Sequence, residues 1–315
     1  MELRQLKYML MVADEKSFSR AAEKLYIAQP YLSQFIQKIE KEIGVKLFDR
    51  SCTPLKLTYA GEHFAKEARQ IIQLDSNLLQ QMKDLTEEKS GQIALGISPV
   101  RGAYILPIVL PAFRKHFPQV EITLYEGTSA ELEEWMNKGV TDLTILSLPI
   151  KSDEFTYEVL LQEKFLIIVP PMHYLAQRAG SNDDPPPLQL SELADEPFIL
   201  LQKGQALRNI ADTLFLQAGY KPNIVLETRN YETAHALASI GLGLTFSTMT
   251  VSQSNSNVAK PVRIFTAEPS FTRTLAIVYC KGKYLTKIEQ AFICMTKELV
   301  LTTLRCPRRG EQAGI

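Results

Sequence analysis

The sequence predicts an α/β protein that begins with a winged helix-turn-helix, continues in one long helix and ends in a larger α/β body. Three observations predict this order. First, apolar residues recur at helical spacing up to about residue 43 and then in two short alternating runs. Second, the stretch 59–88 carries one apolar stripe. Third, strand-like and helix-like segments alternate from residue 92 onward. We expect the parts to span residues 1–58, 59–89 and 90–304, with a tail at 305–315.

The composition is that of an ordinary soluble globular protein. The chain has 315 residues, and 35 Lys and Arg balance 35 Asp and Glu. No apolar run approaches the roughly 18 residues of a membrane span, and no secretory signal is visible, so we expect a cytoplasmic protein with no membrane partner. Residues 1–60 hold ten basic and seven acidic side chains, so the head is basic and the body acidic, which weakly favours nucleic acid as a partner of the head.

The first 58 residues predict three helices and a hairpin. Leu3 opens the first helix, Ser17 or Ser19 can cap a short second one, and Pro30 suits the start of a third that ends at Gly44. The small pair Ala21-Ala22 allows two helices to cross steeply over a tight turn, as in a helix-turn-helix. We expect the third helix to bury Leu32, Phe35, Ile36, Ile39 and Ile43, and the wing strands to be Val45–Phe48 and Leu55–Thr58.

The stretch 59–88 predicts a long helix with Thr58 as its N-cap. Its apolar residues alternate in steps of four and three, which is a heptad seam interrupted by Asp75. Such a stripe packs either on the chain's own body or on the same helix of a second copy, and we favour the second copy. The seam residues predicted to make this dimer are Phe64, Ala68, Ile71, Leu78, Met82 and Leu85.

From residue 92 the alternation of strands and helices predicts a parallel sheet with helices on both faces. The strands are expected at Ile93–Ser98, Val120–Tyr125, Leu143–Leu148, Lys164–Pro170, Phe198–Leu201, Ile224–Thr228, Leu244–Ser247 and Thr274–Tyr279. The helices are expected at Tyr104–Phe117, Ala130–Lys138, Leu207–Ala218, Tyr231–Ile240 and Tyr284–Leu304. Polar loops are expected at Gln177–Pro187 and Val251–Ala259.

The head resembles that of the LysR-type transcriptional regulators. The resemblance is carried over residues 1–61 by Leu3-Arg4-Gln5-Leu6, Ser17-Phe18-Ser19-Arg20-Ala21-Ala22-Glu23-Lys24-Leu25, Ala28-Gln29-Pro30, Leu32-Ser33-Gln34, Ile43-Gly44-Val45, Leu47-Phe48-Asp49-Arg50 and Leu57-Thr58-Tyr59-Ala60-Gly61. It continues more loosely to about residue 300, through Phe113–Pro118, Asp142–Ile145, Val169–Pro171 and Gly241–Gly243.

This resemblance implies a DNA-binding head, a dimerising linker helix and an effector domain like a periplasmic binding protein. Lobe one would span about 91–163 and 270–304, and lobe two about 164–269. The chain would cross between the lobes at Leu166–Pro170 and near Phe265–Thr274. The implied function is a ligand-responsive regulator that binds double-stranded operator DNA as a dimer or tetramer, and contacts RNA polymerase if it is an activator.

A recognition helix presents hydrogen-bonding groups to base edges in the major groove. On the free face of the third helix we expect Ser33, Gln34 and Gln37 to meet bases and Lys38 to meet a phosphate. Many members of the family have Arg at the position of Gln34. The alternative for each is a merely solvated polar side chain. The full predicted DNA-binding set is Ser19, Arg20, Pro30, Tyr31, Ser33, Gln34, Gln37, Lys38, Arg50 and Lys56.

An effector would bind where strands end and helices begin, because helix N-termini there attract anions. Ser98-Pro99-Val100-Arg101, Gly127-Thr128-Ser129, Gln202-Lys203-Gly204-Gln205 and Arg229-Asn230 all follow predicted strands. Their hydroxyls and cations suit a small anion or carboxylate, while ordinary helix capping is the competing explanation. The predicted effector-binding residues are Ser98, Pro99, Val100, Arg101, Thr128, Ser129, Gln202, Lys203 and Arg229.

Enzymatic and metal-binding motifs are not found in the sequence. There is no G-x-S-x-G, Walker A or H-E-x-x-H, and the four histidines are scattered. We therefore expect no enzyme, no cofactor and no metal. The alternative that the residues leave open is a small-molecule-binding α/β enzyme or receptor with an accessory helical domain.

Overall fold

The computed structural model describes residues 2–86, 90–150, 152–179, 186–248, 250, 263–268 and 271–304. The chain divides into two compact units, Met1–Glu88 with Gly282–Thr286 and Lys89–Lys281 with Lys287–Ile315. The five residues Gly282–Thr286, which we had expected in the effector domain, thus belong with the N-terminal unit. The predicted loop 251–259 and the predicted tail 305–315 lie outside the described residues.

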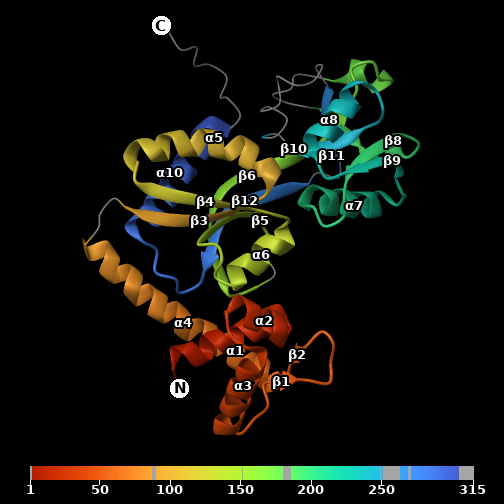
Figure 1. Cartoon of the computed structure of the whole chain (residues 1–315). Helices are drawn as coiled ribbons and strands as arrows, with labels where there is room; N and C mark the ends of the chain where they lie inside the picture. The colour runs from red at the N-terminus through yellow and green to blue at the C-terminus, as the bar shows by residue number, and fades with distance from the viewer. Residues whose placement is uncertain are drawn as a thin grey trace. The chain divides into compact units, whose positions relative to one another are not determined.

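The head of the first unit is a winged helix-turn-helix, as predicted (Figure 1). It comprises α1 (Leu3–Glu15), α2 (Phe18–Lys24) and α3 (Gln29–Ile43), followed by a hairpin of β1 (Phe48–Asp49) and β2 (Lys56–Leu57). Ser17, not Ser19, is the N-cap of α2, and its side chain accepts a hydrogen bond from the Arg20 backbone. Gly44 ends α3 in a left-handed conformation at φ 76°, which glycine adopts without steric cost.

The head's core lies between its three helices and the start of α4. Leu6, Met9, Ala22, Leu32 and Ile36 are buried there. The prediction that Ile43 joins this core was wrong, since the side chain is 40% exposed at the last position of α3. One turn earlier, Glu40 is buried instead, because its Oε1 accepts hydrogen bonds from the backbones of Leu47 and Phe48.

The long helix α4 spans Tyr59–Thr86, and the Thr58 side chain caps it by accepting from the Gly61 N–H. Its first turns pack on α1, where Ala65 and Ala68 are buried. Beyond them the apolar stripe is open to solvent. The exposed apolar side chains on this stretch are Ile71, Leu74, Leu78, Leu79 and Met82. The side chain of Leu85 lies outside the described set.

The segment Gly282–Thr286 is held on α4 by two polar side chains. Asn77 donates to the Gly282 carbonyl (2.9 Å), and its Oδ1 accepts from the Tyr284 N–H (2.9 Å). The Tyr284 hydroxyl donates to Asp84 (3.2 Å). Asn77 and Asp84 are consequently buried, although they lie on a solvent-facing helix.

The second unit is built on a mixed sheet in the order β4-β3-β5-β12-β6-β11-β7. β3 (Gly91–Ile97) pairs in parallel with β4 (Val120–Glu126) and with β5 (Leu143–Ser147). β12 (Thr272–Cys280) runs antiparallel to β5 and to β6 (Phe155–Val169), so the prediction of a purely parallel sheet was wrong. Helices α5 (Pro99–His116) and α10 (Lys287–Leu304) cover one face and α6 (Ser129–Asn137) the other (Figure 1).

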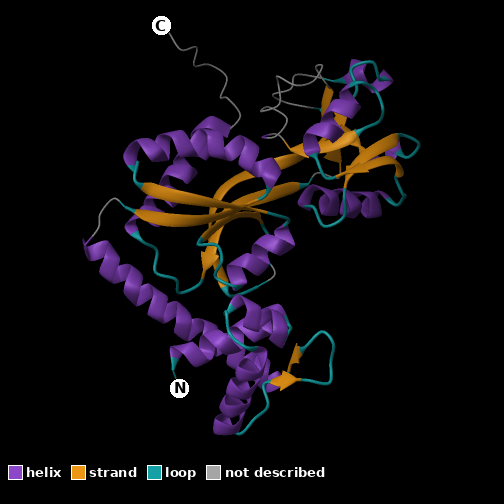
Figure 2. Ribbon diagram, viewed as in Figure 1, coloured by secondary structure: helices purple, strands orange, loops and turns teal. Residues whose placement is uncertain are grey.

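β6 serves both lobes of this unit, and Figure 2 shows it running with β12 from one lobe into the other. Residues up to Lys164 pair with β12, while Phe165 onward pairs with β10 (Thr245–Thr248) and β11 (Arg263–Glu268). The change of partners falls between Lys164 and Phe165, slightly before the predicted crossing at Leu166–Pro170. The stretch Phe155–Glu163 was not predicted as strand, because its apolar residues do not form one continuous run.

Lobe two is completed by short strands and two helices around the end of β6. The strands are β7 (Pro187–Gln189), β8 (Pro197–Leu201) and β9 (Asn223–Thr228), with 3-10 turns at Tyr174–Arg178 and Leu190–Leu193. The helices are α7 (Ala206–Ala218) and α8 (Tyr231–Ser239). Within the described residues, no helix is long and apolar enough to cross a membrane.

Candidate functional site

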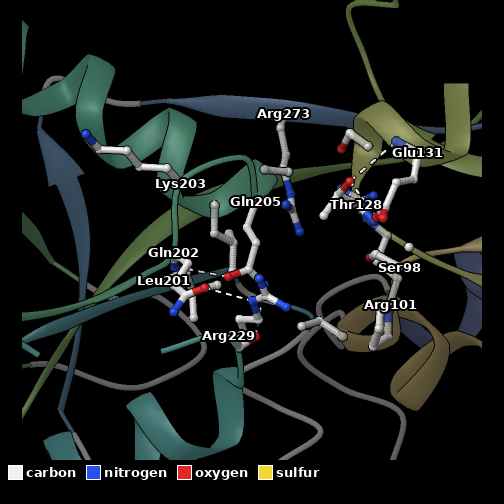
Figure 3. A pocket seen from close by; sticks show the side chains of 16 residues that line it. Ser98, Arg101, Thr128, Glu131, Leu201, Gln202, Lys203, Gln205, Arg229 and Arg273 are labelled. Carbon is white, nitrogen blue, oxygen red and sulfur yellow. Dashed lines mark hydrogen bonds between the residues drawn. The ribbon is translucent and has the colours of Figure 1, made fainter. Parts of the chain in front are cut away.

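A pocket of about 320 Å³ opens between the two lobes of the second unit (Figure 3). Its volume equals roughly ten water molecules in the liquid, which suits a small metabolite. Lobe one contributes the starts of α5 and α6, lobe two contributes the loops after β8 and β9, and β12 contributes Arg273. The described residues that line it are Ser98, Pro99, Val100, Arg101, Gly127, Thr128, Ser129, Glu131, Leu201, Gln202, Lys203, Gln205, Ala206, Leu207, Arg229 and Arg273.

Three helices begin at this pocket. α5 starts at Pro99 directly after β3, α6 at Ser129 after β4, and α7 at Ala206 after β8. The first N–H groups of a helix have no intrahelical acceptor, and they carry the positive end of the helix dipole. Their convergence favours a bound anion.

Arg101 is the most unusual residue of the pocket. It is only 2% exposed; its Nη2 donates to the Ser147 hydroxyl, while Nε and Nη1 have no hydrogen-bond partner among the described residues. Burial, together with the nearby charge of Arg273, lowers the pKa of Arg101 to about 10, so the guanidinium stays charged at neutral pH. The Tyr104 hydroxyl, one turn along α5, is also buried and makes no hydrogen bond within the described part of the chain, and burial raises its pKa to about 12.

Arg273 and Glu163 form a buried ion pair where the chain passes between lobes. They are direct cross-strand neighbours on β12 and β6. Arg273 Nε donates to Glu163 Oε1, and the Thr250 hydroxyl donates to Glu163 Oε2. Because both charged groups are buried, the pair is costly to break by removing one partner.

Lobe two presents Arg229 to the pocket. Its Nε donates to Gln202 Oε1 (2.8 Å), and its carbonyl accepts from Gln205 Nε2 (2.9 Å). The two terminal nitrogens of Arg229 make no hydrogen bond among the described residues. In Figure 3 the guanidinium groups of Arg229 and Arg273 point toward one another, whereas the amine of Lys203 points away.

Helix capping accounts for the hydroxyl of Thr128 but not for that of Ser98. Thr128 caps α6: its Oγ1 accepts from the Glu131 N–H (3.4 Å) and donates to the Glu131 carboxylate (2.8 Å). The Thr128 backbone N–H also donates to this carboxylate (2.8 Å); that bond, the hydroxyl bond and the charge of Arg229 lower the pKa of Glu131. Ser98 sits at the N-cap of α5, but its side chain makes no capping hydrogen bond, so it is available to a ligand.

All nine residues predicted to bind the effector line this one pocket; their contact with a ligand stays a prediction. Glu131, Gln205 and Arg273 were missed. The only sequence signal for Arg273 was that it is a charged residue next to an apolar strand. Its pairing with Glu163, 110 positions away in the chain, has no local signature.

The predicted DNA-binding residues lie on the surface of the head. Ser19, Arg20, Pro30, Tyr31, Gln34, Gln37, Lys38 and Lys56 are exposed, while Ser33 is half-buried. Arg50 is engaged within the protein: it donates to Ser33 Oγ (3.2 Å), pairs with Glu40 (3.5 Å) and lies 5.0 Å from the Phe18 ring centroid. Arg50 thus ties the wing to α3.

Comparison with known proteins matches both units. The family described as "Bacterial regulatory helix-turn-helix protein, lysR family" matches residues 3–62, and the "LysR substrate binding domain" matches residues 86–300. The uncharacterized HTH-type transcriptional regulator YcgK of Bacillus subtilis is 32% identical over 314 residues, covering 96% of each chain.

Two further similarities concern OxyR. The DNA-binding transcriptional dual regulator OxyR of Escherichia coli is 28% identical over 285 residues, covering 90% of this chain and 91% of OxyR. A full-length OxyR carrying a single substitution, from Pseudomonas aeruginosa, has a similar fold, with a TM-score of 0.71 at 23% identity and 99% of each chain covered.

Proposed function

Because the chain belongs to the LysR family of bacterial transcriptional regulators, we propose that it binds operator DNA as a homo-oligomer and changes transcription when a small anion occupies the pocket between its lobes. The matched families and the relatives are transcriptional regulators, which gives no support to the enzyme alternative. In this proposal residues 1–58 form the DNA-binding domain, 59–89 the linker and 90–304 the effector domain. The protein acts in the cytoplasm, where its DNA is.

The exposed face of α3 supports the DNA-binding proposal. Gln34, Gln37 and Lys38 are exposed there and carry amides and an ammonium group, which bind base edges and phosphates. Ser33, held by Arg50, lies beside them. In this proposal Lys56 on the wing contacts the backbone of the duplex, as does Arg20 at the start of α2, which also donates to the Glu15 carbonyl.

The exposed stripe on α4 supports a homo-oligomer. Ile71, Leu78 and Met82 belong to the predicted heptad, and Leu74 adds to the same side of the helix. Water contact with four large apolar side chains is unfavourable, and the same helix of a second copy would cover them.

The observation that carries the effector proposal is Arg101. Two nitrogens of this buried guanidinium have no hydrogen-bond partner where the structure is described, which is costly unless something accepts those hydrogen bonds. An anion in the adjacent pocket would supply both acceptors and charge. A ligand that contacts both lobes would also change their relative angle and so reposition the DNA-binding heads of the oligomer.

The first test is selection of bound sequences from a random pool of double-stranded DNA with the full-length protein at stated salt. We expect an interrupted palindrome, because a two-fold dimer reads two half-sites. Binding that is indifferent to sequence and lost with salt would contradict the proposal. Small organic anions are then added to the selected operator, and a change in its affinity or footprint is the expected sign of an effector.

A further inference from the structure

The pocket has an imbalance of charge. Four cationic side chains line it, and Glu131 is the one carboxylate among its described lining residues. Glu163 pairs with Arg273 and balances that arginine. Two positive charges therefore remain unbalanced among the described residues when Lys203 is counted, although its amine points away in Figure 3. The four cations are Arg101, Lys203, Arg229 and Arg273.

Arg101 stands out among the buried arginines. Three arginines are buried in the described part of the chain, and two of them have carboxylate partners: Arg273 pairs with Glu163, and Arg208 with Asp212 and Glu227. Arg101 makes no such ion pair, and its hydrogen bond to Ser147 uses only one of its three nitrogens. An acidic group held by Arg101 would complete the pattern that the other two show.

Arg229 lines the same pocket from the opposite lobe. It follows β9 in lobe two, whereas Arg101 follows β3 in lobe one. Its Nε is occupied by Gln202, but its terminal nitrogens are available, and the charge of Glu131 across the pocket is its only carboxylate neighbour among the described lining residues. Two acid-binding groups thus lie on the two walls of one small pocket.

We infer that the effector is an anion with two acidic ends, a short dicarboxylate, with one end held by Arg101 of lobe one and the other by Arg229 of lobe two. This rests on the proposed function and names the ligand class of the same pocket. Each carboxylate then meets one guanidinium, whose planar fork matches its two oxygens. The unbonded Ser98 hydroxyl at the start of α5 adds a donor near the first end.

The test compares each dicarboxylate with its own monoamide, because the two have nearly the same size and differ by one charge. Malonate, succinate, glutarate and adipate are titrated into the full-length protein by calorimetry, beside their monoamides and inorganic phosphate. We expect at least one dicarboxylate to bind about tenfold or more tightly than its monoamide, which is about 1.4 kcal/mol at 25 °C. Equal affinity within every pair would overturn the inference.

Variants then assign the two ends. Arg229→Gln should remove the preference for the dicarboxylate over the monoamide and leave monoamide binding nearly unchanged. Arg101→Gln should abolish the binding of the dicarboxylate and of the monoamide. Arg101→Lys keeps the positive charge and guards against a folding defect of Arg101→Gln. The matched control is Arg178→Gln on lobe two, an exposed arginine outside the pocket that pairs with Glu192.

The outcomes separate the inference from the proposed function. If monoamides or inorganic phosphate bind as tightly as dicarboxylates, need Arg101 and change operator binding, the proposed function stands and the two-ended ligand is wrong. If no anion binds and water alone satisfies Arg101, both the anionic effector and the dicarboxylate fail. Binding that is insensitive to Arg101→Gln and Arg229→Gln places the anion elsewhere and overturns the assignment.

Discussion

A single charge on the apolar stripe of α4 should dissociate the proposed dimer. The perturbation is Leu78→Asp. Leu78 is 56% exposed in the single chain, so about half of its side chain is free to be buried by a second copy. Fully burying a leucine contributes about 1.5–3 kcal/mol, so covering this part contributes about 0.8–1.7 kcal/mol.

A symmetric dimer buries the residue twice, which makes the loss about 1.7–3.4 kcal/mol. This weakens the dimer about twenty- to three-hundredfold, and the cost of desolvating two aspartates adds to it. The measurement is the dimer dissociation constant by sedimentation equilibrium, with circular dichroism to verify the fold.

The matched control is Ser76→Asp. Ser76 is exposed and lies two positions from Leu78, about 160° around the helix, so it carries the same new charge away from the stripe. Equal dissociation constants for the two variants would show that the stripe is not the interface. An unfolded Leu78→Asp monomer would refute the premise that this side chain is exposed.

Three further outcomes are expected. Gln34→Ala should weaken binding to the selected operator by about 1–3 kcal/mol while binding to random DNA stays unchanged, as measured by anisotropy titration; equal loss on both would make Gln34 a backbone contact. Glu40→Leu leaves the Leu47 and Phe48 N–H groups without their acceptor, so urea unfolding should show a loss of about 2–4 kcal/mol that exposed Glu42→Leu does not share. Burial lowers the pKa of His235 below 6.5, so the unfolded chain binds the proton more readily and stability falls as pH drops below about 6.5; His235→Gln should lessen the fall between about pH 7 and about pH 5.

Local signals explain why the head was predictable. The N-cap Ser17, the proline near the start of α3 and the left-handed Gly44 each act within a few residues, and the apolar spacing between them sets which faces are buried. Ile43 was predicted wrongly because apolar spacing alone does not show which residues pack over the end of α3; Glu40 is buried there instead, since its carboxylate accepts from the Leu47 and Phe48 N–H groups.

The sequence predicted those pocket residues that follow one rule about strand ends. Ligand-binding residues gather where strands end and helices begin, and this rule found residues on both lobes. Arg273 escaped it, since it lies near the start of β12 and reaches the pocket only because β12 and β6 are neighbours. Strand order is a property of the whole chain, as is the mixed direction of this sheet, so neither is encoded in a local stretch.

The contact between Asn77 and Gly282 joins residues 205 positions apart. The N-terminal unit is therefore interrupted in the chain: its last five residues are synthesised after the whole stretch Lys89–Lys281. A growing chain that has released α4 from the ribosome still has Asn77 and Asp84 uncovered. Folding of the intervening lobes shortens the effective loop that must be closed, so it lowers the entropic cost of this contact. The surface of α4 is thus finished only after Gly282–Thr286 has been synthesised.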